Sequence, residues 1–518
     1  MFDFFPSRPL LLTGLLAGVA TIAPAGEARA VDIQNLRSFE DWCVARASLP
    51  PGARDTVNAL LAAADTKDCK RAATLFSRTE SLRLSFSYSG QIKCTVPQSL
   101  PALLPMPMPS QRYFPPPIAY GEPLQPFPDI LILPERSLYS NQFMLSDLRP
   151  LTALTNLIDL SIGYGEISDL TPLTNLPNLK HLSIYSNHYC KQPTTDISPL
   201  ATLKNLTSLN LRNNKITSIE PIKYLKNLIT LRLESNQIKS LEPISSLTNL
   251  EVLSLSGNQI SNIELLSSHT RLKYLYLSGN QLTDITPLQT LSNLTEVALA
   301  ENQITDLAPL RTLTALKYLE LNSNQISDLS PLQSLTQLTT LHIRNNRISD
   351  LRPLQSLTRL STLNLGRNQI TELTSLRSLT NLYTVNLYGN QVTNLQPLQS
   401  LQKLAILDLT NNRVKTVSPL RSLKQLDQLR IGGNPVTPGV ARALPGVETI
   451  DTSTTEFALV LPRPPRAYKP VPNLFKLPQP RRRWPTPSQP VLRSPVFLPN
   501  RLPPTPNRLP PTTAPGGR

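Results

Sequence analysis

The sequence predicts a repeat solenoid, with a parallel β-sheet on its concave face and short 3-10 or loop turns on its convex face. Three features of the repeat predict it. An asparagine recurs every 22 residues from Asn214 to Asn434, a Leu-x-Leu-type pair precedes each one, and Ile, Leu or Val follows two residues later. One repeat of this length cannot bury its own apolar face, so its neighbours must bury it.

Each part of the repeat predicts one element. Leu209 and Leu211 alternate with polar residues, which indicates a strand with one buried face. Asn214 stands where the chain leaves this strand. Its side chain can donate and accept hydrogen bonds, so stacked copies are expected to satisfy the backbone groups of the turn. Further along the repeat, Pro331 after Ser330 favours the start of a short helical turn on the convex side.

The repeat resembles a known family. The pattern Leu-x-x-Leu-x-Leu-x-x-Asn-x-Ile resembles the leucine-rich repeat, and the run Asp-Leu-Ser-Pro-Leu-Gln-Ser-Leu at 328–335 is similar to the short, internalin-like subclass of bacteria. The resemblance implies an arc-shaped leucine-rich-repeat array over residues 135–450, with about 14 turns.

Residues 1–30 have the features of a secretory signal peptide. An apolar run from Leu10 to Ala23 follows Arg8, and Ala28-Arg29-Ala30 forms a small-x-small cleavage site. The alternative is an uncleaved anchor. We therefore expect a secreted, periplasmic or cell-surface protein.

Residues 31–96 are predicted to cap the start of the array. Trp42, Val44, Val57, Leu60 and Leu61 fit two amphipathic helices. The segment resembles the helical N-terminal cap of some secreted bacterial repeat proteins. A cap is also expected because an array end exposes apolar surface.

The chain contains four cysteines. In an exported protein, Cys43 and Cys69 are expected to form a disulfide, and the alternative is two free thiols. Cys190 is then the partner left for Cys94. This bond would tie the segment before the array to a predicted bulge at residues 188–194, where extra residues interrupt the 22-residue spacing.

Two further segments are rich in proline. Residues 97–134 are predicted to be an extended or disordered insertion that could lie along the array. Residues 451–518 are predicted to be a disordered tail, because from Leu461 onward they hold eighteen prolines and eleven basic residues but no acidic residue. This tail carries most of the formal net charge of +16.

The sequence contains no pattern typical of an enzyme. Its four histidines do not form a His-Glu-x-x-His motif, and no glycine-rich phosphate loop is present. His181, His188 and Cys190 lie close together but lack the spacing of a zinc site, so no metal or cofactor is predicted.

The predicted concave face offers a binding patch. Residues six, four and two positions before each asparagine point to this face. In the middle repeats they include aromatic side chains beside charges of both signs, which is typical of binding surfaces. The candidate partner-binding residues are Tyr274, Tyr276, Glu296, Tyr318, Glu320, His342, Arg344 and Tyr388. The alternative is a solvated strand face without a ligand. His181 and Tyr185, with Tyr164 nearby, form a smaller second candidate.

The predicted function is binding rather than catalysis. We expect an exported monomer that recognises a protein or glycan partner on the concave face. One alternative is a structural envelope protein that its basic tail tethers to an anionic surface, since nucleic acid is not expected as a partner after export. The other is a regulatory subunit of an enzyme such as a phosphatase.

Overall fold

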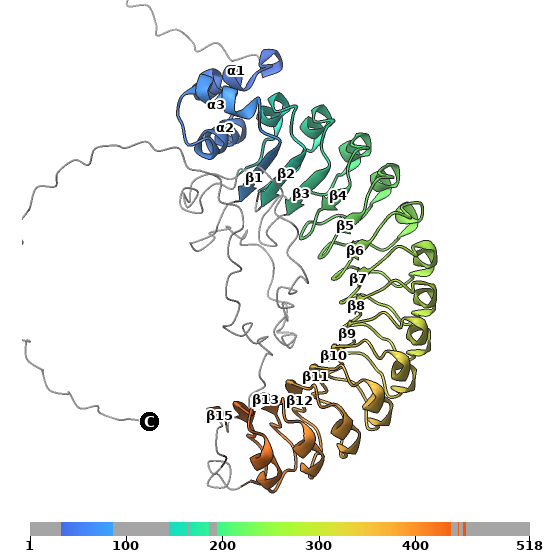
Figure 1. The fold of residues 1–518 in the computed structure, drawn as a ribbon. Coiled ribbons are helices and arrows are strands. Elements are labelled where there is room, and N and C mark those ends of the chain that lie inside the picture. Colours follow the sequence, from blue (N-terminus) through green and yellow to red (C-terminus); the bar gives the residue numbers. More distant parts are fainter. Residues whose placement is uncertain are drawn as a thin grey trace, which may run out of the picture. The chain divides into compact units, whose positions relative to one another are not determined.

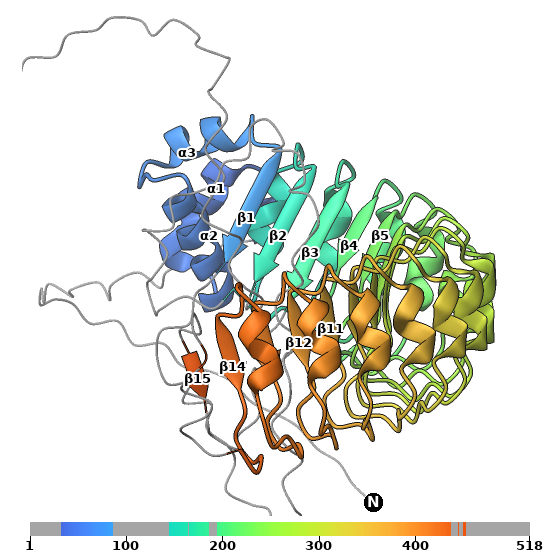
Figure 2. The same cartoon turned by 60° about the horizontal axis from the view of Figure 1, so that its bottom comes forward.

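The computed structural model describes residues 33–85, 145–163, 165–185, 194–436, 444 and 449–451. Within these ranges, one parallel sheet runs in strict chain order from β1 to β15. The strands line the inner side of an arc and the 3-10 helices form its outer side (Figures 1 and 2). The predicted leucine-rich-repeat solenoid, with a small helical region at its start, is confirmed.

Most strands are only three residues long, because each repeat contributes one buried leucine flanked by two face residues. The strands are β1 Ser81–Ser85, β2 Asp159–Gly163, β3 His181–Tyr185, β4 Ser208–Asn210, β5 Thr230–Arg232, β6 Val252–Ser254, β7 Tyr274–Tyr276, β8 Glu296–Ala298, β9 Tyr318–Glu320, β10 Thr340–His342, β11 Thr362–Asn364, β12 Thr384–Asn386, β13 Ile406–Asp408, β14 Gln428–Arg430 and β15 Thr449–Asp451.

A 3-10 helix follows each asparagine turn from Asn214 to Asn412 and usually holds a proline near its start. The 3-10 helices of the array are η3 Arg149–Ala153, η4 Thr171–Asn175, η5 Ser198–Thr202, η6 Glu220–Tyr224, η7 Glu242–Ile244, η8 Glu264–Ser268, η9 Thr286–Thr290, η10 Ala308–Thr312, η11 Ser330–Ser334, η12 Arg352–Ser356, η13 Thr374–Ser378, η14 Gln396–Ser400 and η15 Ser418–Ser422. The predicted turn at Ser330-Pro331 is therefore confirmed.

The recurring asparagines form a ladder along the array. The amide group of Asn302 is representative: its Nδ2 donates to the carbonyl oxygens of Leu277 at 3.1 Å and Leu299 at 3.1 Å. Its Oδ1 accepts from the backbone N–H of Leu282 at 3.0 Å. The same bonds recur with a shift of 22 residues, for example at Asn324. The predicted satisfaction of turn groups by stacked amides is confirmed.

Two further ladders were not predicted. In several repeats an asparagine four residues before the strand centre bonds to the previous repeat, as when Nδ2 of Asn249 donates to the carbonyl of Lys226 at 3.2 Å. On the convex side, hydroxyls do the same, as when Oγ1 of Thr312 donates to the carbonyl of Gln289 at 2.8 Å. Some repeats, such as the one that contains Asn293 and Thr290, are thus bonded to the previous repeat at three places around the coil.

The N-terminal region contains three α-helices rather than the two predicted. They are α1 Phe39–Val44, α2 Pro51–Ala63 and α3 Cys69–Phe76, with 3-10 turns η1 Ile33–Asn35 and η2 Ala45–Ser48. Trp42 and Leu60 are buried as expected, but Val44 is 74% exposed. Its position at the last residue of a short helix turns it away from the core, so its assignment to the buried face was wrong.

The predicted disulfide between Cys43 and Cys69 joins α1 to the start of α3, with the two Cα atoms 5.6 Å apart. Cys94, Cys190 and His188 lie outside the described residues, as do the signal segment, the whole Pro-rich insertion and nearly all of the tail.

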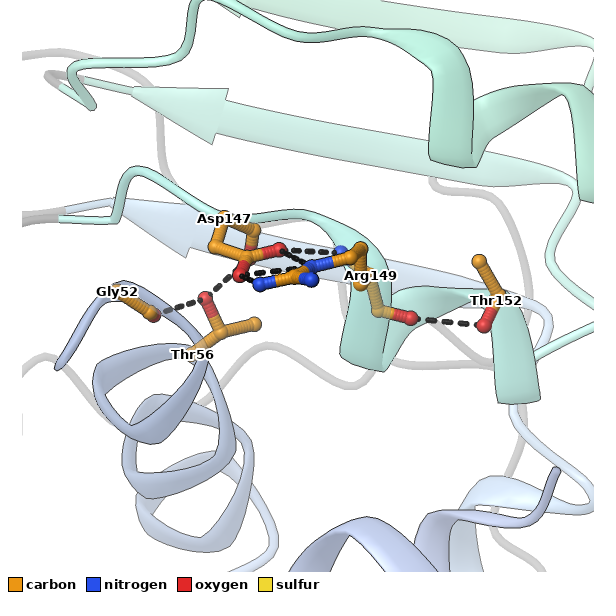
Figure 3. A network of polar contacts seen from close by, with 5 residues as sticks. All are labelled: Gly52, Thr56, Asp147, Arg149 and Thr152. Carbon is orange, nitrogen blue, oxygen red and sulfur yellow. Dashed lines mark hydrogen bonds and ion pairs between the residues drawn. The ribbon is translucent and has the colours of Figure 1, made fainter. Parts of the chain in front are cut away.

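Helix α2 packs closely against the first repeat (Figure 3). Oγ1 of Thr56 donates to the carbonyl oxygens of Gly52 and Asp147. A Cβ at position 52 would lie 2.5 Å from the hydroxyl of Ser146, so a larger residue there would require that hydroxyl to move. Asp147 also forms an ion pair with Arg149, at 2.6 Å. The cap therefore docks through specific polar contacts as well as apolar ones.

Candidate functional site

Four adjacent strands, β7 to β10, bring most of the predicted site residues together. The parallel register places Tyr274, Glu296, Tyr318 and Thr340 in one row across the sheet. A second row contains Tyr276, Ala298, Glu320 and His342. Because both rows lie on the face opposite the buried leucines, the sequence-based positions on the concave side agree with the register. We call the set Tyr274, Tyr276, Glu296, Tyr318, Glu320, Asn322 and His342 the central cluster.

Tyr276 and Glu296 are joined across neighbouring strands. Oη of Tyr276 donates to a carboxylate oxygen of Glu296 at 2.8 Å. Burial raises the pKa of Tyr276, and the charge and hydrogen bond of Glu296 raise it further. The phenol therefore stays protonated and keeps its hydrogen bond to the carboxylate at physiological pH.

Glu320 lies at the centre of a second network. Its two carboxylate oxygens accept from Oη of Tyr318 at 3.3 Å and from Nδ2 of Asn322 at 2.9 Å. The carbonyl oxygen of the Asn322 side chain accepts from the backbone N–H of Arg344 at 2.8 Å. Burial raises the pKa of Glu320 even though these two hydrogen bonds act in the opposite direction. Burial is thus the larger effect on this carboxyl.

His342 closes the cluster on the β10 side. Its ring makes an edge-to-face contact with the ring of Tyr318, with centroids 5.7 Å apart. Burial lowers the pKa of His342 to about 4, so the imidazole is neutral at physiological pH. Its Nε2 is buried and has no hydrogen-bond partner in the described part of the chain.

The structure separates one predicted residue from the rest. Tyr388 follows β12, two strands beyond His342, and only 9% of it is exposed. The guanidinium of Arg367 lies 5.4 Å from its ring centroid. Arg344, by contrast, lies two residues after β10 and borders the cluster through the bond of its backbone N–H to Asn322.

Asn322 is the residue of the cluster that sequence reasoning did not select. It stands two positions before a ladder asparagine, so the period places it on the concave face, but an isolated amide gave no reason to prefer it. Its contact with Glu320 depends on the adjacent side-chain conformations, which the repeat pattern does not specify.

The second candidate site is only partly described. Within it, the guanidinium of Arg212 lies 4.8 Å from the ring centroid of Tyr185. His181 is the first residue of β3, whereas Tyr164 and His188 lie outside the described residues.

Within the described ranges, no group of three or more His, Cys, Asp or Glu side chains is arranged to hold a metal ion. None of the helices in these ranges has the length and apolar character needed to cross a membrane.

Comparison with known proteins relates the array to a family. A model described as leucine-rich repeats in two copies matches residues 177–224, 226–268 and, in overlapping pairs, 270–400. A comparison with curated proteins gave no match.

Several solved structures are similar. An internalin from Listeria monocytogenes shares 30% identity, with 60% of this chain and 85% of that one covered and a TM-score of 0.50. A leucine-rich-repeat protein from Leptospira interrogans shares 26% identity, with 61% and 87% covered and a TM-score of 0.53. Another Listeria monocytogenes protein, internalin C2, shares 44% identity over 36% of this chain and 83% of its own, with a TM-score of 0.35.

Proposed function

Because this chain belongs to the leucine-rich-repeat family and is similar to bacterial internalins, we propose that it is an exported protein of the 22-residue, internalin-like subclass that binds a protein partner on its concave face. Leucine-rich-repeat arrays of this type are binding scaffolds, because the curvature of a solenoid creates an extended concave surface. The central cluster is the observation that carries the proposal for this chain.

The composition of the cluster and its internal hydrogen bonds both support binding. Tyrosine rings and charged groups stand together on a rigid sheet, which is the composition of an interaction hot spot. The side chains already hold one another through the Tyr276–Glu296 and Asn322–Glu320 hydrogen bonds. A surface that is ordered before binding loses less conformational entropy when a partner arrives.

A triple variant tests the proposal. Replacement of Tyr276, Tyr318 and Arg344 by alanine should abolish recovery of partners after crosslinking on intact cells and quantitative mass spectrometry. A matched control replaces Tyr224, Tyr383 and Arg359, which are exposed and lie outside the concave face. Equal recovery by the parent, the variant and the control would contradict binding at the cluster.

Export is tested separately. The signal-like residues 1–30 support cleavage after Ala30. N-terminal sequencing of the mature protein from envelope and culture fractions should begin at Val31. An intact N-terminus in both fractions would favour the uncleaved anchor.

The basic tail favours a second candidate function, that of a structural envelope protein. Residues 461–518 carry eleven basic and no acidic side chains, a composition that attracts anionic surfaces. Deletion of these residues should release the protein from the cell envelope without changing partner capture if the tail acts as a tether. Unchanged localisation would argue against this role.

A further inference from the structure

We propose that the central cluster binds an arginine side chain of the protein partner, with its guanidinium over Ala298, between Tyr276 and Glu320. This inference rests on the proposed binding function and specifies the chemistry of the group that the concave face recognises. Four observations carry it: the small residues on and just after β8, the two carboxylates that form no ion pair within the described residues, the neutral imidazole and the tyrosine rings.

In the second row of the cluster, β8 carries a short side chain between two long ones. Ala298 and the following Ala300 are 5% and 6% exposed, whereas the register places Tyr276 and Glu320 on either side of Ala298. Neighbouring strands lie about 4.8 Å apart, so the backbones that carry Tyr276 and Glu320 are roughly 10 Å apart. Because both alanines are nearly covered, a guanidinium above Ala298 would contact the side chains of Tyr276 and Glu320 rather than the sheet itself.

The two carboxylates have acceptor capacity left. Within the described structure, Glu296 accepts from Tyr276, and Glu320 accepts from Tyr318 and Asn322, all of which are neutral donors. The described ion pairs involve neither glutamate. A carboxylate has about four acceptor positions, so each can still receive a cationic donor. Burial of a carboxylate without a counter-charge is unfavourable, and a bound cation would remove that cost.

His342 supports a polar ligand by an independent observation. Its Nε2 is buried and has no hydrogen-bond partner in the described residues, although polar groups in such positions are usually satisfied. The register places His342 directly beside Glu320. Because this imidazole is neutral, it does not repel a cation, and its free nitrogen can be satisfied when the ligand is present.

The ring systems favour arginine over lysine. A guanidinium is planar, stacks on aromatic faces and donates two parallel hydrogen bonds to a carboxylate. Tyr276 and Tyr318 flank β8 from its two neighbouring strands, and Glu296 lies between them. Two basic side chains border the cluster on the concave face: Arg232, the last residue of β5, whose charge acts on the phenol of Tyr276, and Arg344, two residues after β10.

Selection of peptides displayed on phage against the full chain tests the inference without a known partner. The selected peptides should share an arginine at a fixed position. They should bind the double variant Glu296→Gln with Glu320→Gln about tenfold or more weakly than the parent. A control with the same charge change, Glu264→Gln with Glu372→Gln on exposed positions, should bind within about twofold of the parent.

Replacement of the arginine by citrulline, which keeps its shape but not its charge, should weaken binding to the parent by a similar factor. It should have little effect on binding to the double variant. Ala298→Leu should also block binding, whereas Ser183→Leu, in the same row on β3, should not. Circular dichroism verifies that each variant is folded, and the citrulline comparison needs no variant at all.

The outcomes separate the two proposals. Peptides that require Tyr276 and Tyr318 but contain no fixed arginine would overturn the arginine site and leave concave-face binding intact. Peptides with a fixed arginine that bind citrulline equally well would also overturn it. Failure to select any peptide, or selection of peptides that ignore every concave substitution, would overturn both proposals.

Discussion

At the scale of single residues, the ladder asparagines are the positions where one substitution should cost most. Asn302→Ala removes the acceptor for the N–H of Leu282 and the donor for the carbonyl groups of Leu277 and Leu299. Each unsatisfied buried group costs about 1–3 kcal/mol, so we expect a loss of roughly 3 kcal/mol. Urea unfolding measures it, with Gln303→Ala on the exposed neighbour as control. Equal midpoints for the two variants would contradict a structural role for the ladder.

Glu320 should destabilise the fold at neutral pH. Burial raises the pKa of its carboxyl in the folded state, so its contribution to stability is fully present below the unfolded pKa and is lost as the pH rises through the folded one. Glu320→Gln should therefore unfold at a higher temperature than the parent at pH 7, and this gap should close below about pH 4. Thermal unfolding across this pH range measures the difference. A variant less stable than the parent at pH 7 would show that the carboxylate stabilises the array instead.

His342 should have the opposite pH dependence. Burial lowers its pKa from 6.5 to about 4, so the unfolded chain takes up the proton first as the pH falls. The parent should lose up to about 3 kcal/mol between pH 6.5 and pH 4 for this reason. His342→Gln should remove that part of the loss, which denaturant titrations at several pH values would detect. Parallel curves for the parent and the variant would contradict the lowered pKa.

The residue just before each ladder asparagine shows a limit of sequence reading. All eleven adopt positive φ, from +52° to +70°, but only four are glycine. The other seven are of several residue types, for example Asn213, Glu301 and Arg367, although this conformation is strained for residues other than glycine. The asparagine that follows could be predicted because its chemistry is invariant, whereas the turn conformation is imposed by the surrounding repeats.

At the scale of elements, the repeat strands and 3-10 helices could be predicted because each has a fixed sequence signal. The cap could not be predicted in detail, because it occurs once and its periodicity is short. Its third helix begins at Cys69 with Asp68 as N-cap, whose carboxylate accepts from the backbone N–H of Lys70 and Arg71. The sequence therefore contains a start signal for this third helix, which the prediction of two helices did not use.

The cap should depend on its disulfide. The Cys43–Cys69 bond closes a loop with a sequence separation of 26, so its removal should cost about 3 kcal/mol through the unfolded state. The double variant Cys43→Ser with Cys69→Ser should show faster hydrogen exchange in α1 to α3 than in the middle repeats. Contacts such as that of Thr56 with Asp147 should then loosen as well. Uniform exchange along the chain would contradict a cap that unfolds as a separate unit.

At the scale of the whole molecule, the repeat period predicted which residues would lie on the concave face but not how those residues interact. The period placed Tyr276 and Glu320 on the concave face, because every repeat has the same register. The hydrogen bonds within the central cluster depend on side chains from different repeats, each of which varies independently. A solenoid separates the two kinds of information, since its buried positions repeat and its exposed positions do not.

That separation leads to a prediction for the whole array. Deletion of residues 303–324 removes one complete 22-residue period, so Gln325 would follow Asn302 and β8 could pair with β10 in the same register. The ladder bonds would re-form, because the same bond occurs in each repeat. Oδ1 of Asn324 accepts from the backbone N–H of Ile304, and Oδ1 of Asn346 accepts from that of Ile326. The shortened protein should fold with an unchanged circular dichroism spectrum and a slightly lower unfolding midpoint, because solenoid stability is roughly a sum over repeats. It should nevertheless lose partner binding, because Tyr318, Glu320 and Asn322 are gone.

Deletion of residues 369–390, which removes β12 and Tyr388, should keep both the fold and the binding. Loss of binding in both deletions would mean that the partner contacts the array well beyond the central cluster.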